Sequence, residues 1–307
     1  MSEHVIYLLG PYKVPGFEGE RNVRVYLPKE GQQSEPSPVL YVFDGQNIFH
    51  DDPSFAGGWH LHRAVRDLVE GGLTAPVLVG IDNGGSERIH ELAPFPGNGS
   101  NGKLDEFLSW ITSDLVPRVQ KQFNVRKDPQ GTAIGGSSMG GLAALYAHFR
   151  RPDVFGGALC MSPSLWFADK KIFEWLDAQQ LPRTTRLYVD AGAKEDNGSV
   201  LRNAEHLVEM LKGRGCPENA LLFYPDEEGN HCEEAWRRRA PAALQFLFSG
   251  VVAPEVIAAT EAMEAAAEAQ APVVMTAPEA QAPVVVPAPP AEALALVQTT
   301  VEAHAAA

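Results

Sequence analysis

Hydrophobic positions along the first 250 residues follow two periods, and the two kinds of segment alternate. Short apolar runs, rich in valine, leucine and aromatic residues, are typical of strands that are covered on both faces. Longer segments repeat their apolar residues every three or four positions, as amphipathic helices do. The strand-like runs cover residues 22–28, 38–44, 75–82, 131–137, 157–163, 185–192 and 220–226. The helix-like segments cover residues 60–72, 104–123, 139–151, 169–179, 200–215 and 232–248.

Alternating strands and helices predict parallel strands joined by crossover helices, because a tight hairpin cannot join parallel neighbours. The helical spacing is clearest in the second helix-like segment, where Leu104, Phe107 and Ile111 recur on one side. We therefore expect an α/β fold formed by residues 1–250. Its sheet should be doubly wound and mostly parallel, with helices on both faces.

The composition changes near Gly250. Residues 251–307 consist mainly of Ala, Pro, Val and Glu, contain no aromatic residue, and repeat the sequence EAQAPVV at Glu268 and Glu279. Such a segment has too little apolar side chain to offset the entropy that is lost on ordering. We expect a largely disordered tail, with one helix before Pro272 as its regular part. A spacer is the expected role of this tail, and a specific docking role is the alternative.

The net charge of −14 is divided between the domain and the tail. The tail holds seven glutamates and no Lys, Arg or Asp, so it carries −7 and the domain carries the other −7. Neither part has the basic stripe that binding to nucleic-acid phosphates requires. We expect no nucleic-acid partner, and the sequence does not determine the oligomeric state.

Targeting signals and cysteines bear on the compartment. No apolar run reaches 18 residues, so we expect no transmembrane helix and no membrane association. The N-terminus lacks a basic stretch followed by an apolar one, which a secretory signal would need. The cysteines are Cys160, Cys216 and Cys232, which form no CxxC pair, and their odd number fits reduced thiols. We expect a cytoplasmic protein.

Two adjacent serines lie among glycines in the stretch "TAIGGSSMGGLAALYAHF". Only Ser138 has glycine two residues before and two after it, at Gly136 and Gly140; Ser137 does not. This G-x-S-x-G pattern, between an apolar run and a helix former, indicates a nucleophile elbow, a sharp strand-to-helix turn that presents a serine. Side chains at both flanking positions should collide across the turn. The following helix N-terminus favours developing negative charge.

A serine nucleophile needs a base, and the base needs an acid that orients it. In α/β-hydrolases the chain order is Ser, acid, His. His231 lies in a glycine-containing loop after the last strand-like run, where the carboxyl ends of the strands would place a base. His148 falls inside the elbow helix and should point away, and His206 falls on a solvated helix face.

The acid and the oxyanion donors follow from the other loops. The acid should come after the run 185–192, where Glu195 and Asp196 are both candidates. The oxyanion hole needs two backbone N–H groups. One is that of Met139, directly after the nucleophile, and we expect the other from Gln46, in the turn after the run 38–44.

The sequence resembles the esterase D / enterochelin-esterase-like family of α/β-hydrolases over about residues 20–248. The segments that carry the resemblance are "LYVFDGQNIF", "GIDNGGSERIHELAPF", "GTAIGGSSMGGLAALYAHFRRPDVFGGALCMSPSLWF", "LYVDAGAKED" and "EEGNHCEEAW". The resemblance implies Ser138 as nucleophile, His231 as base and the DGQN turn as oxyanion loop. It places the acid three residues beyond Gly192, at Glu195, and leaves Asp196 for the following helix.

The resemblance also implies that Trp166 and Arg88 lie near the substrate pocket. Core packing for Trp166 and a structural salt bridge for Arg88 are the alternatives. Two departures weaken the siderophore and polysaccharide readings. We expect no extra N-terminal domain of the kind that enterochelin esterases often carry, and no secretion signal of the kind that many feruloyl and xylan esterases have.

Together these features predict a serine esterase that acts on small-molecule carboxylic esters through an acyl-enzyme, with no metal and no organic cofactor. An acyltransferase that uses the same triad is one alternative, because an alcohol can replace water as the acceptor. A hydrolase-like binding protein with an idle triad is the other. The sequence does not identify the ester.

Overall fold

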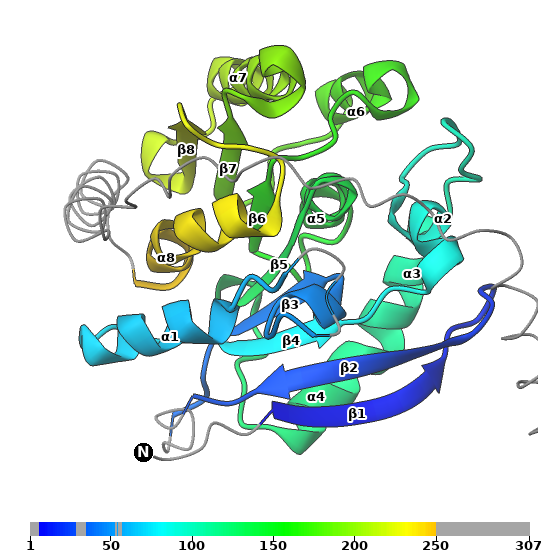
Figure 1. Ribbon diagram of the computed structural model, residues 1–307, viewed down its shortest axis with the longest axis vertical. Helices are drawn as coiled ribbons and strands as arrows, with labels where there is room; N and C mark the ends of the chain where they lie inside the picture. Colours follow the sequence, from blue (N-terminus) through cyan, green and yellow to red (C-terminus); the bar gives the residue numbers. More distant parts are fainter. Residues whose placement is uncertain (1–5, 29–34, 53, 55–56, 250–307) are drawn as a thin grey trace, which may run out of the picture. The chain divides into compact units, whose positions relative to one another are not determined.

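The computed structural model of the chain describes residues 6–28, 35–52, 54 and 57–249. An eight-stranded sheet runs through it in the order β1-β2-β4-β3-β5-β6-β7-β8 (Figure 1). The strands are β1 (Ile6–Lys13), β2 (Glu20–Tyr26), β3 (Val39–Phe43), β4 (Val77–Ile81), β5 (Thr132–Ser137), β6 (Gly157–Met161), β7 (Arg186–Gly192) and β8 (Leu221–Asp226).

The strands from β4 through β3 and β5 to β8 are parallel, whereas β1 and β2 run antiparallel at one edge. The predicted mostly parallel α/β sheet is therefore confirmed, and each predicted strand is present within a few residues of its expected bounds. Because the sheet is parallel from β3 to β8, the loops that leave these strands meet at one edge, where ligands bind in open α/β sheets.

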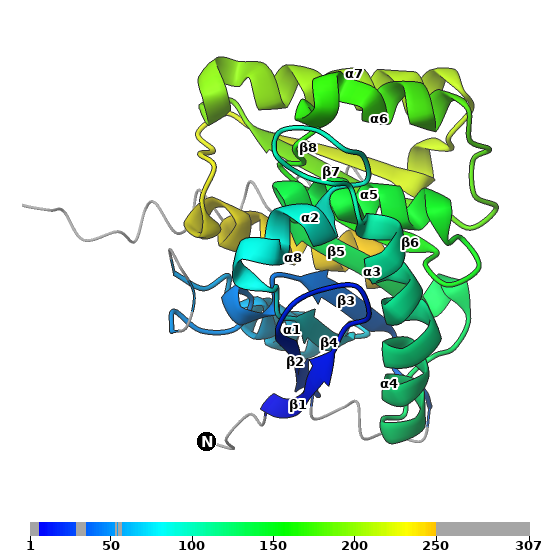
Figure 2. The same cartoon turned by 90° about the vertical axis from the view of Figure 1, so that its right-hand side faces the viewer.

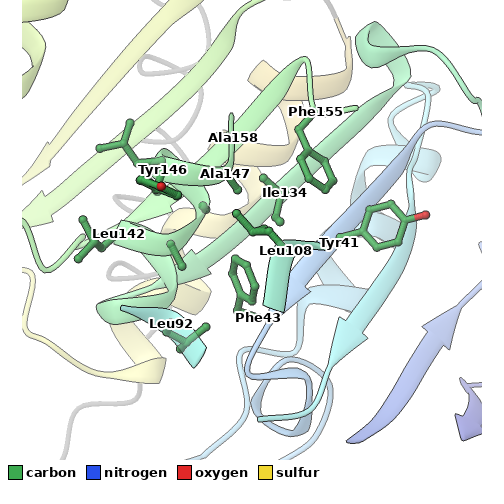
Figure 3. Close-up of a cluster of buried hydrophobic side chains, with 14 of the residues drawn as sticks. Tyr41, Phe43, Leu92, Leu108, Ile134, Leu142, Tyr146, Ala147, Phe155 and Ala158 are labelled. Atoms are coloured by element: carbon green, nitrogen blue, oxygen red, sulfur yellow. The ribbon is translucent and has the colours of Figure 1, made fainter. Parts of the chain in front are cut away.

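Both faces of the sheet are buried, which explains the continuous apolar runs. In β3 the side chains of Val39, Tyr41 and Phe43 belong to one hydrophobic cluster, and those of Leu40 and Val42 belong to a second on the other face. Figure 3 shows part of the first cluster around Tyr41 and Phe43. Alternate residues of a strand point to opposite faces, so a strand covered on both sides is apolar throughout.

Helices cover both faces, as predicted. The first cluster receives side chains from α2 to α7, and the second receives them from α1 and α8 (Figures 1 and 2). The helices are α1 (Leu61–Glu70), α2 (Arg88–Leu92), α3 (Leu104–Trp110), α4 (Val116–Gln122), α5 (Met139–Arg150), α6 (Phe167–Asp177), α7 (Ser199–Gly213) and α8 (Glu233–Ser249).

The structure differs from the prediction in three places. The sequence pattern predicts neither β1, the edge strand, nor the short helix α2. The segment 104–123 is not one uniform helix, because a π-helical turn, Ile111–Leu115, separates α3 from α4. Pro117 is the second residue of α4 and has no N–H to donate, so the regular hydrogen-bond ladder cannot continue through it.

The expected tail, residues 251–307, lies outside the described residues. In the described part of the chain, no helix combines the length and the apolar composition that crossing a bilayer requires. The cytoplasmic location stays a prediction.

Candidate active site

Ser138 occupies the turn between β5 and α5 alone, with backbone angles φ 56° and ψ −120°. A non-glycine residue in this region is strained, and it persists only where its surroundings hold it. Ser138 N–H donates to the Met161 carbonyl at 2.9 Å, and its carbonyl accepts from the N–H groups of Leu142 and Ser164 at 3.1 and 3.0 Å. These three bonds fix the turn in the shape of a nucleophile elbow.

The flanking glycines do not have equal roles. A Cβ atom at Gly136 would lie 2.6 Å from the carbonyl carbon of Gly140, a distance that cannot be accommodated. A Cβ atom at Gly140 would meet Asp44 and Phe43 at 3.4 Å, an ordinary contact. The prediction that both positions exclude a side chain is right for Gly136 and wrong for Gly140. The crowded helical position is Gly141, where a Cβ would lie 2.9 Å from the Met161 carbonyl oxygen.

His231 and Glu195 form a hydrogen-bonded pair, with 2.7 Å between Nδ1 and Oε2. Glu195 begins the short turn after β7, and His231 lies between β8 and α8, so adjacent parallel strands bring them together. The Glu195 side chain is fully buried, whereas that of His231 is 39% exposed. The other carboxylate oxygen of Glu195 accepts from the Ser162 hydroxyl at 2.7 Å and from Gly192 N–H at 2.8 Å.

The environment of Glu195 favours its ionised form. Burial alone would raise the pKa of this carboxyl group. The hydrogen bonds from His231 and Ser162 outweigh burial, so the pKa of Glu195 lies below its ordinary value. A carboxylate in this state can stabilise a positive charge on the His231 ring.

Asp196, the alternative acid, has a different environment. Its side chain is exposed, and its carboxylate accepts a hydrogen bond from the hydroxyl of Ser199, the first residue of α7. The structure brings Glu195, and not Asp196, to His231. Asp196 therefore lies near the start of α7, as expected, but its hydrogen bond is with the Ser199 hydroxyl and not with a free N–H group of the helix.

The histidines that we set aside lie elsewhere. His148 is fully buried in α5, with its Nδ1 2.9 Å from the Phe155 carbonyl oxygen. His206 is exposed on α7, where its ring contacts Phe173.

Ser138 and His231 line the same pocket, which has a volume of about 490 Å³. The hydrogen bond of the Ser138 hydroxyl is with the Ser164 hydroxyl, at 3.2 Å, and none joins it to His231 in the described part of the chain. The pocket is lined by Asp44, Gln46, Asn47, Asn83, Arg88, Ser137, Ser138, His231, Glu233 and Trp236.

The turn after β3 contributes to the same pocket. Gln46 lies in a single turn of 3₁₀ helix, Gly45–Asn47. A Cβ atom at Gly45 would lie 2.4 Å from the backbone of Gly80 in β4, so only glycine lets the turn pack so closely. Among the described residues, no protein group accepts a hydrogen bond from the N–H of Gln46 or from that of Met139. Both N–H groups are therefore available to a ligand.

The predictions that Arg88 and Trp166 lie near the substrate pocket have different outcomes. Arg88 lines the pocket, and its guanidinium also donates to both carboxylate oxygens of Asp44 at 2.7 Å, so the salt-bridge alternative and the pocket location both hold. Trp166 is 45% exposed at the start of α6 and is not among the residues that line the pocket. A substrate contact for Trp166 stays a prediction.

The aromatic residue that the structure brings to the pocket is Trp236, which the sequence reading missed. Its ring lies edge-on to that of His231, with 5.1 Å between centroids, and its Nε1 donates to the Ser162 hydroxyl at 2.9 Å. Arg239, one helical turn later, donates to the same hydroxyl at 3.1 Å and is fully buried. The sequence did hold a signal for this pair. Trp236 and Arg239 lie three residues apart near the start of the helix that follows His231.

Arg239 is surrounded by carboxylates. Its guanidinium nitrogens lie 3.4 Å from Asp190, 3.6 Å from Glu195 and 3.6 Å from Asp226. Burial raises the pKa of Asp190 to about 6, although Arg239 opposes this shift. One buried cation therefore faces the acid of the His231 pair and two further acids.

Comparisons with known proteins agree with this fold and identify the family. The model of a family described as putative esterase matches residues 15–247. The uncharacterized protein YbbA of Bacillus subtilis is 24% identical over 245 residues, which cover 75% of this chain and 93% of YbbA. The iron(III) enterobactin esterase of Dickeya dadantii is 31% identical over 246 residues, or 74% of this chain and 52% of that enzyme.

Solved structures show the same architecture. The BES protein from Bacillus cereus matches with a TM-score of 0.65 and 22% identity, over 81% of this chain and 95% of that one. An IroE-like serine hydrolase from Shewanella oneidensis matches with a TM-score of 0.65 and 20% identity, over 80% of each chain. These matches establish the fold.

The sheet order, the covered faces and the loops at one edge define an α/β-hydrolase. The chain belongs to the putative esterase family, and it is of the enterochelin-esterase type that the sequence resemblance predicted. Its activity class is carboxylic ester hydrolysis. The chain spans about half the length of the iron(III) enterobactin and salmochelin esterases that it matches.

Proposed function

We propose that the protein is a serine esterase that hydrolyses small-molecule carboxylic esters through an acyl-enzyme, with Ser138 as nucleophile, His231 as base and Glu195 as the orienting acid. One observation carries the proposal: a histidine bonded to a buried carboxylate lines the same pocket as a serine on a strained strand-to-helix turn. Serine, base and acid in this arrangement are the parts that nucleophilic acyl transfer requires.

In the first half-reaction, the Ser138 oxygen attacks the acyl carbon and gives its proton to Nε2 of His231. Because Nδ1 of His231 donates to Glu195, the lone pair of the neutral ring is on Nε2. The Ser138 hydroxyl first has to leave Ser164, its partner at 3.2 Å, and turn toward the base. Apo hydrogen bonds of catalytic groups are commonly longer or differently aligned than in the substrate complex.

The tetrahedral oxyanion is stabilised by the N–H groups of Met139 and Gln46, which have no acceptor within the described part of the chain. When the intermediate collapses, the bond between the acyl carbon and the alcohol oxygen breaks, and His231 protonates the departing alcohol. Water then attacks the acyl-enzyme, with His231 taking its proton, and the carboxylic acid leaves. No metal or organic cofactor has a part in these steps.

The pocket fits a small ester that carries polar groups. A volume of about 490 Å³ falls in the range of pockets that hold small organic ligands. Arg88, Glu233 and Asn83 contribute polar atoms to its wall. The enzymes that the chain resembles act on enterobactin, salmochelin, triacetylfusarinine C and feruloyl esters, according to their names. We infer a polar ester rather than a long-chain lipid.

Labelling with a fluorophosphonate probe tests the nucleophile. We expect the wild type and Ser137→Ala to be labelled and to hydrolyse p-nitrophenyl esters, and Ser138→Ala to do neither. Ser137 is a matched control, because it is adjacent, buried at the end of β5 and also lines the pocket. Labelling of Ser138→Ala would refute the assignment, and an unreactive wild type would favour the idle-triad alternative.

Esters of graded acyl length then define the substrate class. If short acyl groups with polar substituents react fastest, the inference about the pocket holds. The same assay with added acceptor alcohols separates hydrolysis from the acyltransferase alternative, because an acyltransferase would form the transesterified product in place of the free acid.

A further inference from the structure

Three histidines that the proposed reaction does not use lie together, close to the turn that contains Gln46. One ring nitrogen of each of His50, His60 and His62 lies within 4.8 Å of the other two. The ring centroids of His50 and His62 are 5.2 Å apart, and those of His60 and His62 are 6.0 Å apart. His60 and His62 are buried, whereas His50 is exposed.

Two of the six ring nitrogens are buried with no partner. Nδ1 of His60 and Nδ1 of His62 accept or donate no hydrogen bond among the described residues, although both side chains are more than nine-tenths buried. Besides the other two histidines, the rings of Tyr26 and Phe49 lie against the His62 ring. Buried polar atoms in native proteins normally have a partner, so two such atoms in one cluster point to a missing ligand.

Asp51 orients one of the rings. Its Oδ1 lies 3.0 Å from Nε2 of His60 and accepts from Gly58 N–H at 2.9 Å. A carboxylate bonded to one nitrogen of a histidine fixes the tautomer and directs the lone pair of the other nitrogen outward. This is the usual support of a metal-binding histidine. In His60 the nitrogen left free by Asp51 is Nδ1, the one without a partner.

We propose that His50, His60 and His62 bind one divalent late transition-metal ion, such as Zn²⁺, with Asp51 as the outer support of His60. Three imidazoles suit Zn²⁺, Cu²⁺ or Ni²⁺, and they do not suit Ca²⁺ or Mg²⁺, which prefer oxygen ligands. Tetrahedral Zn²⁺ with bonds of about 2.0–2.1 Å needs nitrogens roughly 3.3 Å apart. The nitrogens, which lie within 4.8 Å of one another, would therefore approach by up to about 1.5 Å when the metal binds. The exposed His50 can supply much of that movement.

The surrounding charges support a nitrogen-bound ion over an oxygen-bound one. Two cationic side chains, Arg63 and Arg237, act electrostatically on His60, and Arg237 lies 3.8 Å from the carboxylate of Asp51. A hard cation needs several carboxylates, and among the described residues the carboxylate bonded to the cluster is Asp51, which also contacts Arg237. Metal–imidazole bonds depend less on net negative charge, so the three rings remain the binding groups.

The site would link the residues directly after the Gln46 turn to the start of α1. Trp59 N–H donates to the Asn47 carbonyl and Leu61 N–H to the Ile48 carbonyl, each at 2.8 Å, so both ends of this segment lie side by side. His60 itself has a left-handed backbone, with φ 51°, at the start of α1. A metal that bridges His50 and His60 would hold the two ends together independently of these bonds.

Calorimetric titration of the untagged, EDTA-treated protein with ZnCl₂ near neutral pH tests the proposal. We expect one Zn²⁺ per chain, and in His50→Ala a dissociation constant raised by at least about tenfold, as losses around metal sites commonly give. His50→Ala should fold normally, because the side chain is exposed. His206→Ala, which removes an exposed histidine on α7, is the matched control and should bind as the wild type does.

His231→Ala separates this site from the pocket, because Zn²⁺ can also bind a pocket histidine. Binding should persist in His231→Ala. The proposal is overturned if the wild type binds no Zn²⁺, if His50→Ala binds as tightly as the wild type, or if binding disappears in His231→Ala. Co²⁺ gives a second readout: the visible absorption of tetrahedral Co²⁺ should appear with the wild type and be lost in His50→Ala.

Discussion

The hydroxyl of Ser162 donates a hydrogen bond to the buried carboxylate of Glu195, with 2.7 Å between Oγ and Oε1. The same hydroxyl oxygen accepts hydrogen bonds from Trp236 and Arg239. One small side chain at the end of β6 therefore joins the acid to two residues of α8. We interpret Ser162 as a positioning residue, which acts on the reaction through Glu195.

Ser162→Ala should reduce both stability and turnover. It removes a hydrogen bond to a charged group, about 1.5–3 kcal/mol, and leaves two buried donors without an acceptor. We expect kcat to fall by about tenfold, which corresponds to about 1.4 kcal/mol of the activation barrier. The measurement is kcat as a function of pH. The acid limb of this profile should move to higher pH, because Glu195 loses one of the hydrogen bonds that lower its pKa. Ser199→Ala, at the start of α7, is the control and should leave the profile in place.

Glu195→Gln should slow the enzyme far more than Asp196→Asn. A glutamine in place of the acid disturbs the His231 tautomer and cannot stabilise the charged ring, so we expect kcat to fall by about 10²–10⁴ with little change in KM. Asp196→Asn alters a contact with Ser199 at the start of α7 and should cost about 1 kcal/mol or less of stability. Steady-state kinetics of both variants decide this, and a slower Asp196→Asn enzyme would refute the assignment.

Gly136→Ala and Gly140→Ala should have opposite effects on stability. The first places a methyl group 2.6 Å from the Gly140 backbone, so we expect a loss of several kcal/mol or no folded protein. The second places one at an ordinary contact distance inside α5, where alanine is preferred over glycine by up to about 1 kcal/mol. Urea unfolding of the two variants measures the difference, and equal losses would contradict the geometry of the turn.

Asp190 should make the fold less stable as the pH rises from about 4 to 6. Burial raises the pKa of this carboxyl group to about 6 in the folded protein, whereas an unfolded aspartate titrates near 3.9. Between these values the folded state holds a proton that the unfolded state has lost. The contribution of Asp190 to the free energy of unfolding therefore falls as the pH rises, by about 3 kcal/mol in total.

The comparison of wild type with Asp190→Asn isolates this effect from other groups. In the wild type, Asp190 accepts a hydrogen bond from Ser162 N–H at 2.8 Å, and the side-chain oxygen of asparagine can accept the same bond. Urea unfolding from pH 4 to 7 should show the variant gaining stability relative to the wild type as the pH rises. Parallel curves for the two proteins would show that Asp190 does not titrate in this range.

Local sequence was enough for the parts of the fold that are locally determined. The strands of the parallel sheet could be predicted because they are apolar on both faces. The nucleophile elbow could be predicted because Gly136 and Ser138 belong to one short sequence pattern. The edge strand β1 could not, because its apolar residues Tyr7 and Leu8 are exposed and the segment shows no clean alternation. The π-helical turn before Pro117 was also hidden, since its apolar spacing is close to that of an α-helix.

The candidate site also has residues that local sequence predicts and residues that only the packed structure reveals. Ser138, His231 and Glu195 each follow the carboxyl end of a parallel strand, and chain order alone predicts that they lie near one another. The network of Ser162, Trp236 and Arg239 depends on how α8 packs against β6 and β7, which no local pattern specifies. The histidine cluster likewise joins residues on both sides of a loop. Its recognition needs the paired ends of that loop, and so we expected no metal from the sequence.

The strained backbone of Ser138 has a consequence for engineering. Its angles, φ 56° and ψ −120°, are those that glycine adopts freely at the first central position of a type II′ turn. Ser138→Gly should therefore be more stable than Ser138→Ala by about 1–3 kcal/mol, the usual strain of such a position. The residue on which we expect turnover to depend most is also one at which the native sequence sacrifices stability. Selection for heat resistance alone, without selection for activity, would tend to replace the nucleophile.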